Sequence, residues 1–273
     1  MRKVICISDW AADDLAYQEF GTALSGFLKT PDNLRLSRIV TTSSTIQTGF
    51  MVAQCAYTEE RLGVPSDSLI FANTDPRSVD NSSSSARHGA EFMIARLTSG
   101  LIVCGPNNGF SLSFVKGHID AVFRYVNFET LSISRSRDLF SRVIAHLVEY
   151  LEDELELEEV HMSTISDKPM DHVVLHIDNF QNIVTSFTQE EALERSEFGG
   201  YLKVNIKSEV REAKIVNHRF AGIPGELVIY PGSKGHLDNP YMEISVWHES
   251  DHRSLKKHMP FELAAPGDLI VIS

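Results

Sequence analysis

The chain has no run of apolar residues near the roughly 18–20 that a membrane-spanning helix needs. The apolar run within residues 1–10 is too short for the core of a secretion signal, and polar residues follow it. No internal repeat and no Lys/Arg-rich segment is present, and the formal net charge of the 273 residues is -12. This charge argues against a polyanion as partner. We therefore expect a protein that binds neither a membrane nor nucleic acid.

Cysteine is scarce, with only Cys6, Cys55 and Cys104. Their number is odd, their spacing is not that of a metal site, and each lies in an apolar stretch. Such thiols are expected to be buried and reduced, which favours a cytoplasmic location. Hydrophobic residues make up 42% and charged residues 23%, as in a soluble globular protein of one large or two smaller domains.

Strand and helix patterns alternate over the first 150 residues or so. Short segments rich in Val and Ile predict strands, and apolar residues at helical spacing predict helices between them. The expected strands are 3–8, 38–42, 68–73 and 101–104, and the expected helices follow residue 14, cover 50–62 and cover 134–151, while 118–126 fits either. The alternation predicts a mainly parallel, Rossmann-like α/β domain over residues 1–160.

The remainder of the chain has a different pattern. The acidic run 152–159 predicts a solvated helix end, and 161–171 predicts a linker. Period-2 segments separated by Gly and Pro turns then predict strands at 202–206, 225–230, 242–246 and 269–272, without a convincing helix. We expect a small all-β domain, a sandwich or a barrel, over residues 172–273.

Two acidic turns are candidates for ligand binding. In the segment 177–187, Asp178 leaves one predicted strand and Asn182 enters the next, so a carboxylate for an ammonium group and an amide for a heterocycle edge lie close together. Either these residues bind a ligand or they simply favour the turn. Asp9 and Asp13, after the first strand, either cap the next helix or accept hydrogen bonds from a ribose diol.

Six short groups of residues follow one another over nearly the whole chain. They are Ser8–Asp9–Trp10 with Asp14; Thr74–Asp75–Pro76; Pro106–Asn107–Asn108–Gly109; Arg137–Asp138–Leu139–Phe140 with Ala145–His146–Leu147; Asp178 and Phe180–Gln181–Asn182 with Thr185; and Phe220–Ala221, Gly225 and Gly232–Ser233–Lys234–Gly235 with Glu243–Ile244. In this order they resemble the motifs T-D-F-G…D, V-D-P-G, P-[DN]-N-G, G-R-D-x-F…A-H-L, D-x-F-G-N-x-x-T and Y-A-D…G…G-S-x-G…E-I. These motifs are those of the S-adenosylmethionine (SAM) hydroxide adenosyltransferases, or SAM hydrolases, and of the related fluorinases and chlorinases.

The resemblance implies an N-terminal α/β domain and a C-terminal β-barrel, assembled as a homotrimer with the active site at the subunit interface. It also implies attack on C5′ of SAM with release of methionine, where water yields adenosine and a halide yields a 5′-halo-adenosine. SAM is the substrate, and no metal or redox cofactor is implied. Because a sulfonium is already a good leaving group, the protein mainly needs to position a poor nucleophile and exclude bulk water.

The same resemblance implies which residues bind SAM. Asp14 would bind the ribose hydroxyls, Asp178 the ammonium group, and Ser233 and Lys234 the carboxylate of SAM. Adenine would contact Asn182, Phe220 and the backbone near Val246 and His248. Phe180 would form a wall of the pocket.

The residues at the nucleophile end depart from the family. Asp75 fits the Asp of an Asp–Arg–His trio that holds the attacking water in the hydrolases. Arg87 fits the Arg if the serine-rich loop before it is an insertion, and Arg77 competes for that place. Arg135 stands where the His is expected, and a guanidinium cannot take a proton at neutral pH. His88 is a possible substitute from the loop.

A halogenase-like feature is also present. Ser136 and Ser78 fall where the fluorinases have hydroxyl residues, and with Arg135 they could hold a halide. Asp75 argues against this, because it would place a negative charge beside the anion. Serine is also common at helix starts without any ligand.

Four functions therefore stay open. They are a SAM hydrolase, a SAM-dependent halogenase or other anion adenosyltransferase, a SAM- or adenosine-binding protein without turnover, and a nucleoside hydrolase. The third is favoured by the missing His and by Ala11, Arg77 and Gln181 in place of motif glycines. The fourth rests on a likeness of residues 9–16 to the calcium-binding loop of nucleoside hydrolases.

Overall fold

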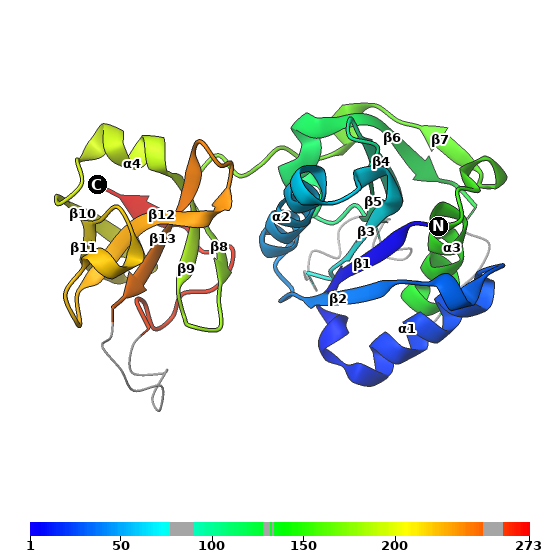
Figure 1. Ribbon diagram of the computed structural model, residues 1–273, viewed down its shortest axis with the longest axis horizontal. Coiled ribbons are helices and arrows are strands. Elements are labelled where there is room, and N and C mark those ends of the chain that lie inside the picture. Colours follow the sequence, from blue (N-terminus) through cyan, green and yellow to red (C-terminus); the bar gives the residue numbers. More distant parts are fainter. Residues whose placement is uncertain (77–89, 128–131, 133, 248–258) are drawn as a thin grey trace. The chain divides into compact units, whose positions relative to one another are not determined.

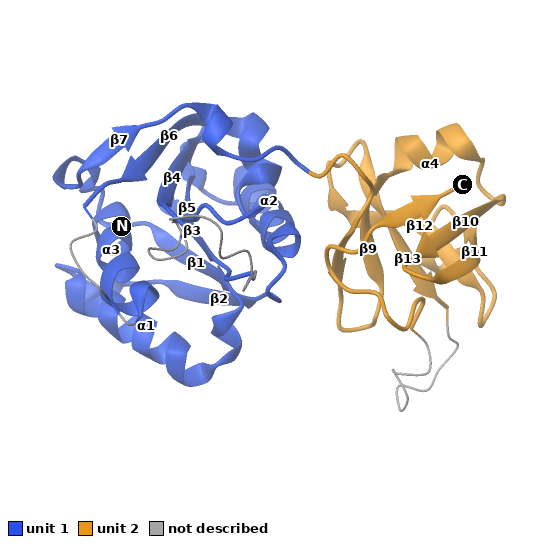
Figure 2. Cartoon of the chain, turned by 180° about the vertical axis from the view of Figure 1, so that it is seen from behind, with its two compact units in different colours: residues 1–168 blue, residues 169–273 orange. Residues whose placement is uncertain are grey.

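The computed structural model describes residues 1–76, 90–127, 132, 134–247 and 259–273. The chain forms two compact units, residues 1–168 and 169–273 (Figure 2). The boundary between them falls inside the segment expected as a linker. Each unit is built on one seven-stranded sheet.

The N-terminal sheet has two halves. Its strands are β1 (Lys3–Ser8), β2 (Leu36–Val40), β3 (Ser68–Asn73), β4 (Phe92–Leu97), β5 (Ile102–Pro106), β6 (Ile119–Tyr125) and β7 (Leu157–Glu159), in the order β2-β1-β3-β5-β4-β6-β7. The pairings from β2 to β5 are parallel. The pairings from β5 to β7 are antiparallel. The expected parallel sheet is therefore confirmed for one half, and the unit is a mixed α/β structure.

Helices of the described residues cover both faces of this sheet (Figure 1). Helices α1 (Asp14–Phe27) and α3 (Ser141–Val148) pack on one face, and α2 (Thr45–Leu62) lies on the other. Asp13 caps α1 by accepting hydrogen bonds from the backbone N–H groups of Leu15 and Ala16, as one of the two sequence interpretations expected.

An aromatic cluster holds the sheet and the α1/α3 face together. Phe20 of α1 stacks on Phe71 of β3 with ring centroids 5.3 Å apart. Phe140, just before α3, lies 4.7 Å from Phe92 and 6.2 Å from Phe71. All four side chains are buried. The segment that ends at Phe140 is thereby anchored to the sheet core.

The C-terminal sheet almost closes on itself. Its strands are β8 (Val174–Ile177), β9 (Ile183–Thr188), β10 (Tyr201–Ile206), β11 (Glu209–Ile215), β12 (Leu227–Gly235), β13 (Pro240–Val246) and β14 (Ile270–Ile272), in the order β14-β10-β11-β12-β13-β9-β8. The first and last strands of this order meet through the bridge between Val173 and Leu269 and the hydrogen bond from Val174 N to Asp268 O. Apolar side chains alternate inward, as in Tyr201–Ile206. The expected barrel-like β unit is confirmed.

Several local expectations were wrong. The acidic run ends in strand β7, whose Leu157, with Leu155 before it, packs on the core, so its period is that of a strand. The expected helix 134–151 is present over residues 135–148, but its first part, Ser136–Phe140, is π-helical, and only the short α3 that follows is α-helical. The β unit contains the helix α4 (Gln189–Arg195), which begins with a capping box formed by Thr188 and Glu191. Strands β4 and β11 were not expected.

None of the helices in the described part of the chain combines the length and the apolar character needed to cross a membrane.

Candidate functional site

The N-terminal unit has a pocket of about 590 Å³ at the carboxyl edge of its parallel strands. Strand β1 leads through α1 to β2 on one side, and β2 leads through α2 to β3 on the other. The chain thus changes direction between β1 and β3, where open α/β sheets usually bind ligands. The residues that line the pocket are Asp9, Trp10, Ala16, Glu19, Phe20, Asn73, Asp75, Ala90, Pro106, Asn108, Ser134, Arg135, Ser136, Arg137 and Phe140.

The pocket brings together three of the expected catalytic residues. Asp75 follows β3, and Arg135 and Ser136 begin the π-helical turn. The other expected catalytic residues, Ser78 and Arg87, lie outside the described residues, as do the competing candidates Arg77 and His88. Residues far apart in the sequence therefore line one cavity, which contains both acidic and basic side chains.

The carboxylate of Asp9 links the ends of β1 and β3. One of its oxygens accepts from Trp10 N at 2.9 Å, and the other accepts from Asp75 N at 3.1 Å. A carboxylate can accept about four hydrogen bonds, so capacity remains on the side that lines the pocket. Asp9 thus caps the short 3-10 turn Trp10–Ala12 and also lines the pocket.

Asp14, expected to bind the ribose, does not line this pocket. Its side chain is 85% exposed and pairs with Arg38 Nη1 at 2.6 Å. Asp14 is the first residue of α1, and its carboxylate is engaged by Arg38 of β2. The spacing of the motif in the sequence did not distinguish the two positions.

Arg135 is one of two arginines among the described residues that line the pocket, and the other, Arg137, is paired with two carboxylates. The Nη2 of Arg135 donates to Ala90 O at 2.8 Å, and its guanidinium lies 4.8 Å from the centroid of the Phe140 ring. Burial lowers the pKa of Arg135, but an arginine stays protonated in proteins. Arg135 can therefore attract an anion but cannot act as the base that the family's His would supply.

Two asparagines that had no assigned role, Asn73 and the motif residue Asn108, also line the pocket. Asn73 Nδ2 donates to Ser136 Oγ at 2.6 Å, and Asn108 Nδ2 donates to Thr74 O at 2.8 Å. Asn73 ends a strand in which every residue is buried. A polar side chain at the carboxyl end of such a strand is the signal that could have identified it.

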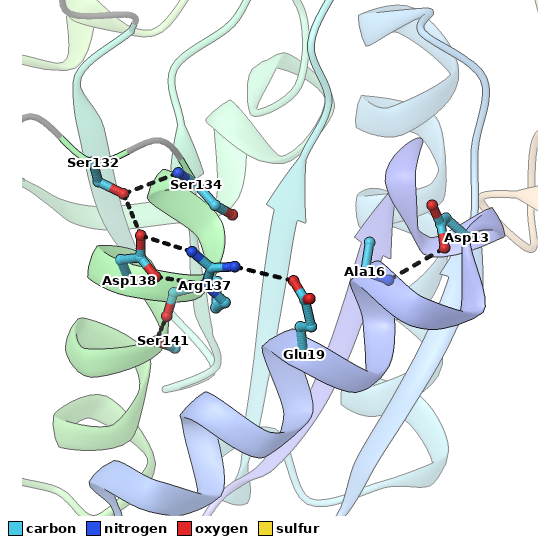
Figure 3. A network of polar contacts seen from close by, with 8 residues as sticks. All are labelled: Asp13, Ala16, Glu19, Ser132, Ser134, Arg137, Asp138 and Ser141. Carbon is cyan, nitrogen blue, oxygen red and sulfur yellow. Dashed lines mark hydrogen bonds and ion pairs between the residues drawn. The ribbon is translucent and has the colours of Figure 1, made fainter.

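Arg137 and Asp138 hold the π-helical turn against α1 (Figure 3). Arg137 donates to Asp138 Oδ1 at 2.6 Å and to Glu19 Oε2 of α1 at 3.2 Å. The hydrogen bond from Arg137 is the main reason why the pKa of Asp138 is lowered, and Ser132 Oγ donates to the same carboxylate. This part of the motif fixes the position of its neighbours Arg135 and Ser136.

In the C-terminal unit, Asp178 organises its own turn. Its Oδ1 accepts from Phe180 N at 2.8 Å and from Asn182 N at 2.9 Å, and its Oδ2 accepts from Asn182 Nδ2 at 2.8 Å. Asp178 and Asn182 are therefore brought together, but by bonding to each other. The turn interpretation is confirmed, and the roles of these residues toward SAM stay predictions.

The backbone of Gln181 explains why the family motif D-x-F-G-N has a glycine at this position. Gln181 has φ +67°, a left-handed conformation that a side chain with Cβ adopts at a cost of roughly 1–2 kcal/mol. We expect Gln181→Gly to raise the free energy of unfolding by about 1 kcal/mol, measured by urea denaturation. Gln181→Ala is the matched control and should change little, because alanine keeps the Cβ. Equal effects of both changes would contradict this explanation.

Three titratable side chains lie beside this turn. Burial lowers the pKa of His176, the charge of Asp178 raises it in part, and the charge of Lys234 lowers it further. His176, Asp178 and Lys234 are thus close enough to affect one another. Two of them are the residues expected to bind the ammonium and carboxylate of methionine.

The lowered pKa of His176 has a consequence for stability. The unfolded chain takes up the proton near pH 6.5, before the folded chain does. The contribution of His176 to the free energy of unfolding is therefore fully present above about pH 6.5. It is lost as the pH falls through the lower pKa that His176 has in the folded chain. We expect His176→Gln to lose less unfolding free energy than the parent chain between pH 7.5 and pH 5.5 in urea titrations. An equal loss in both would contradict the prediction.

Two exposed aromatic rings flank one guanidinium in the same unit. The guanidinium of Arg219 lies 5.8 Å from the Phe180 ring centroid and 5.9 Å from that of Phe220, and the two rings are 61% and 70% exposed. Exposed aromatics near a cation offer planar faces for a heterocycle. Arg219 was not expected, although it directly precedes a motif residue.

The remaining predicted contacts lie on β12 and β13. The pairing of these strands shifts between Pro231 and Gly235, which places Ser233 and Lys234 in the irregular part. Ser233 N donates to Glu243 Oε1 at 3.4 Å. Val246 ends β13, and His248 lies outside the described residues.

The acidic loop after β1 does not form a calcium site. Asp9, Asp13 and Asp14 have separate partners: the ends of two strands, the start of α1, and Arg38. Among the described residues, no three His, Cys, Asp or Glu side chains are grouped to hold a metal. The arrangement does not fit the nucleoside hydrolase alternative.

Comparison with known proteins gives one family match. Residues 172–256 match the model of the SAM hydroxide adenosyltransferase C-terminal domain. An uncharacterized conserved protein from Thermotoga maritima is similar in structure, with a TM-score of 0.73, 16% identity and coverage of 99% of this chain and 100% of that chain. A conserved hypothetical protein from Thermus thermophilus has a TM-score of 0.62 and 18% identity, with both chains covered completely. No curated protein matches the chain. The structural likeness concerns the fold, and the family match supports the resemblance of the motifs that lie within residues 172–256.

Proposed function

We propose that this chain, which carries the C-terminal domain of the SAM hydroxide adenosyltransferases, is an enzyme of that kind that transfers the 5′-adenosyl group of SAM to water. The products are adenosine and methionine. The observation that carries the proposal is the gathering of Asp75, Arg135 and Ser136 in one pocket at the switch point of the sheet. These residues offer an acceptor, a cation and a hydroxyl to one small nucleophile.

The reaction balances with these groups. The oxygen of water forms a bond to C5′ while the C5′–S bond breaks, and the bonding pair leaves with sulfur as the neutral thioether of methionine. Asp75 holds the water through a hydrogen bond and receives its proton as the new C–O bond forms. Arg135 stays charged throughout, so it takes no proton and contributes only its positive charge and its N–H donors to the pocket.

We propose a different residue for one role that the motifs implied. We assign the ribose hydroxyls to Asp9, because Asp9 lines the pocket and Asp14 does not. Asp178 is proposed for the methionine ammonium, and Ser233 with Lys234 for the carboxylate.

Adenine is proposed to contact the rings of Phe180 and Phe220 and the amide of Asn182. The exposure of both rings supports this assignment. Val246 and His248 stay predicted adenine contacts, and the homotrimer, the interface site and the absence of a cofactor also stay predictions.

A second function, transfer of the adenosyl group to a halide, has one observation in its favour. Ser136 and Arg135 present a hydroxyl and a cation to the same cavity, as an anion site requires. Asp75 in that cavity opposes an anion by its charge. Water accommodates both features, because it can accept from Ser136 and donate to Asp75.

Product analysis in ¹⁸O-labelled water tests the proposal. The purified chain is incubated with SAM, with and without chloride, and the products are identified by mass spectrometry. We expect adenosine that carries ¹⁸O at its 5′ oxygen, together with methionine, in both conditions. A 5′-chloro-adenosine would support the second function. Binding of SAM in calorimetry without any product would support a binding protein.

A further inference from the structure

We infer that Asn73 positions the nucleophile, by fixing the hydroxyl of Ser136 as a hydrogen-bond donor to the attacking atom. The inference rests on the proposed adenosyl transfer and adds a residue that the family motifs do not contain. Asn73 lies directly before the Thr74–Asp75–Pro76 group. Its side chain contacts Ser136, which is 63 positions away in the chain.

The direction of this hydrogen bond determines what Ser136 can do. The amide Nδ2 of Asn73 can only donate, so Ser136 Oγ is the acceptor at 2.6 Å. The hydroxyl proton of Ser136 is then left for another partner. Because Ser136 lines the pocket, that proton is available to an acceptor inside it.

The support behind Asn73 is rigid. Asn73 is only 7% exposed and pairs with Ser8 at the end of the parallel β1–β3 ladder. A donor held by a buried strand keeps its orientation before the substrate arrives. Preorganised donors of this kind lower the barrier more than mobile ones, because they need no reorientation during the reaction.

The resulting hydrogen-bond pattern selects one orientation of water. Water would accept from Ser136 with one lone pair, donate one O–H to Asp75, and keep its second lone pair for C5′. In this arrangement Ser136 and Asp75 orient the attacking water, which the family holds with a trio that includes a His. The opposite amide orientation of Asn73 would take up the proton of Ser136 and would leave no donor in the pocket from that hydroxyl.

A double-mutant cycle tests the inference on the purified full chain with SAM. We expect Ser136→Ala to lower kcat for adenosine formation about tenfold, with KM within about threefold. Asn73→Leu should lower kcat about tenfold in the parent chain but less than about twofold in the Ser136→Ala background, because it acts through that hydroxyl. Asn73→Asp, whose ionised carboxylate can only accept, should lower kcat at least as much as Asn73→Leu.

The outcomes separate the inference from the function on which it rests. If the parent chain forms labelled adenosine and Asn73→Leu is equally harmful in both backgrounds, Asn73 is merely structural and the inference is wrong. Full activity of Asn73→Asp would also overturn it, and this variant retains the size of the side chain if Asn73→Leu unfolds. If the parent chain forms no product, the proposed function fails, and the inference fails with it.

Discussion

Replacement of Asp75 by Asn is expected to lower kcat for adenosine formation by about two to four orders of magnitude. The change keeps the shape of the side chain but removes the group that would take the proton of water. Arg135 cannot replace it, since its guanidinium does not accept protons. KM for SAM should stay within about threefold, because the proposed contacts of the ribose and of methionine lie on other residues. Initial rates measured by chromatography of adenosine test this directly.

Asp120→Asn is the matched control for this experiment. Asp120 lies on β6 of the same unit, where it pairs with Arg96 at 3.1 Å, and it does not line the pocket. An exposed ion pair contributes little to stability, so this variant should keep the parent rate. Circular dichroism melting of both variants shows whether the fold is intact. Parent-level activity of Asp75→Asn would remove Asp75 from the mechanism.

The same variant separates water from an anionic nucleophile. If the nucleophile were chloride, the carboxylate of Asp75 would repel it, and Asp75→Asn would raise the rate of 5′-chloro-adenosine formation. If the nucleophile is water, added chloride should leave the low rate of the variant unchanged. The direction of change under chloride thus identifies the nucleophile class.

The sequence predicted the half of the N-terminal sheet whose strands have the strongest patterns. Strand β3 is buried at every residue, and such continuous apolar runs are typical of parallel strands covered on both faces. Strand β7 was missed because alternating Glu and Leu in an acidic run also fits a solvated helix end. The π-helical turn was missed because its residues keep roughly the spacing of a helix.

The candidate site was predictable where it depends on strand ends and not where it depends on side-chain partners. Asp75, Arg135 and Ser136 meet because their segments end or begin at one edge of the sheet. The pairing of Asp14 with Arg38 involves two residues 24 positions apart, and the bond from Asn73 to Ser136 spans 63. A motif gives residue types at fixed spacing, but it does not show which neighbour from elsewhere in the chain will occupy a side chain.

The largest predicted loss of affinity concerns Asp178. We expect Asp178→Ala to weaken SAM binding by at least about 100-fold in calorimetry, because it would leave the methionine ammonium without its counter-charge. Affinity for adenosine, which has no ammonium group, should change much less. The same variant also loses the acceptor of Phe180 N and Asn182 N, so loss of affinity alone would not separate binding from turn formation.

Asp178→Asn makes that separation. Its amide oxygen can still accept from the two backbone N–H groups of the turn, while its charge and the acceptor of Asn182 Nδ2 are gone. If Asp178 binds the ammonium, Asp178→Asn should keep the parent melting temperature within a few degrees and still lose most of the SAM affinity. If Asp178 serves only the turn, Asp178→Asn should bind SAM as the parent does, and Asp178→Ala should weaken SAM and adenosine alike. The ratio of SAM to adenosine affinity in the two variants therefore decides between the ligand role and the purely structural role of this carboxylate.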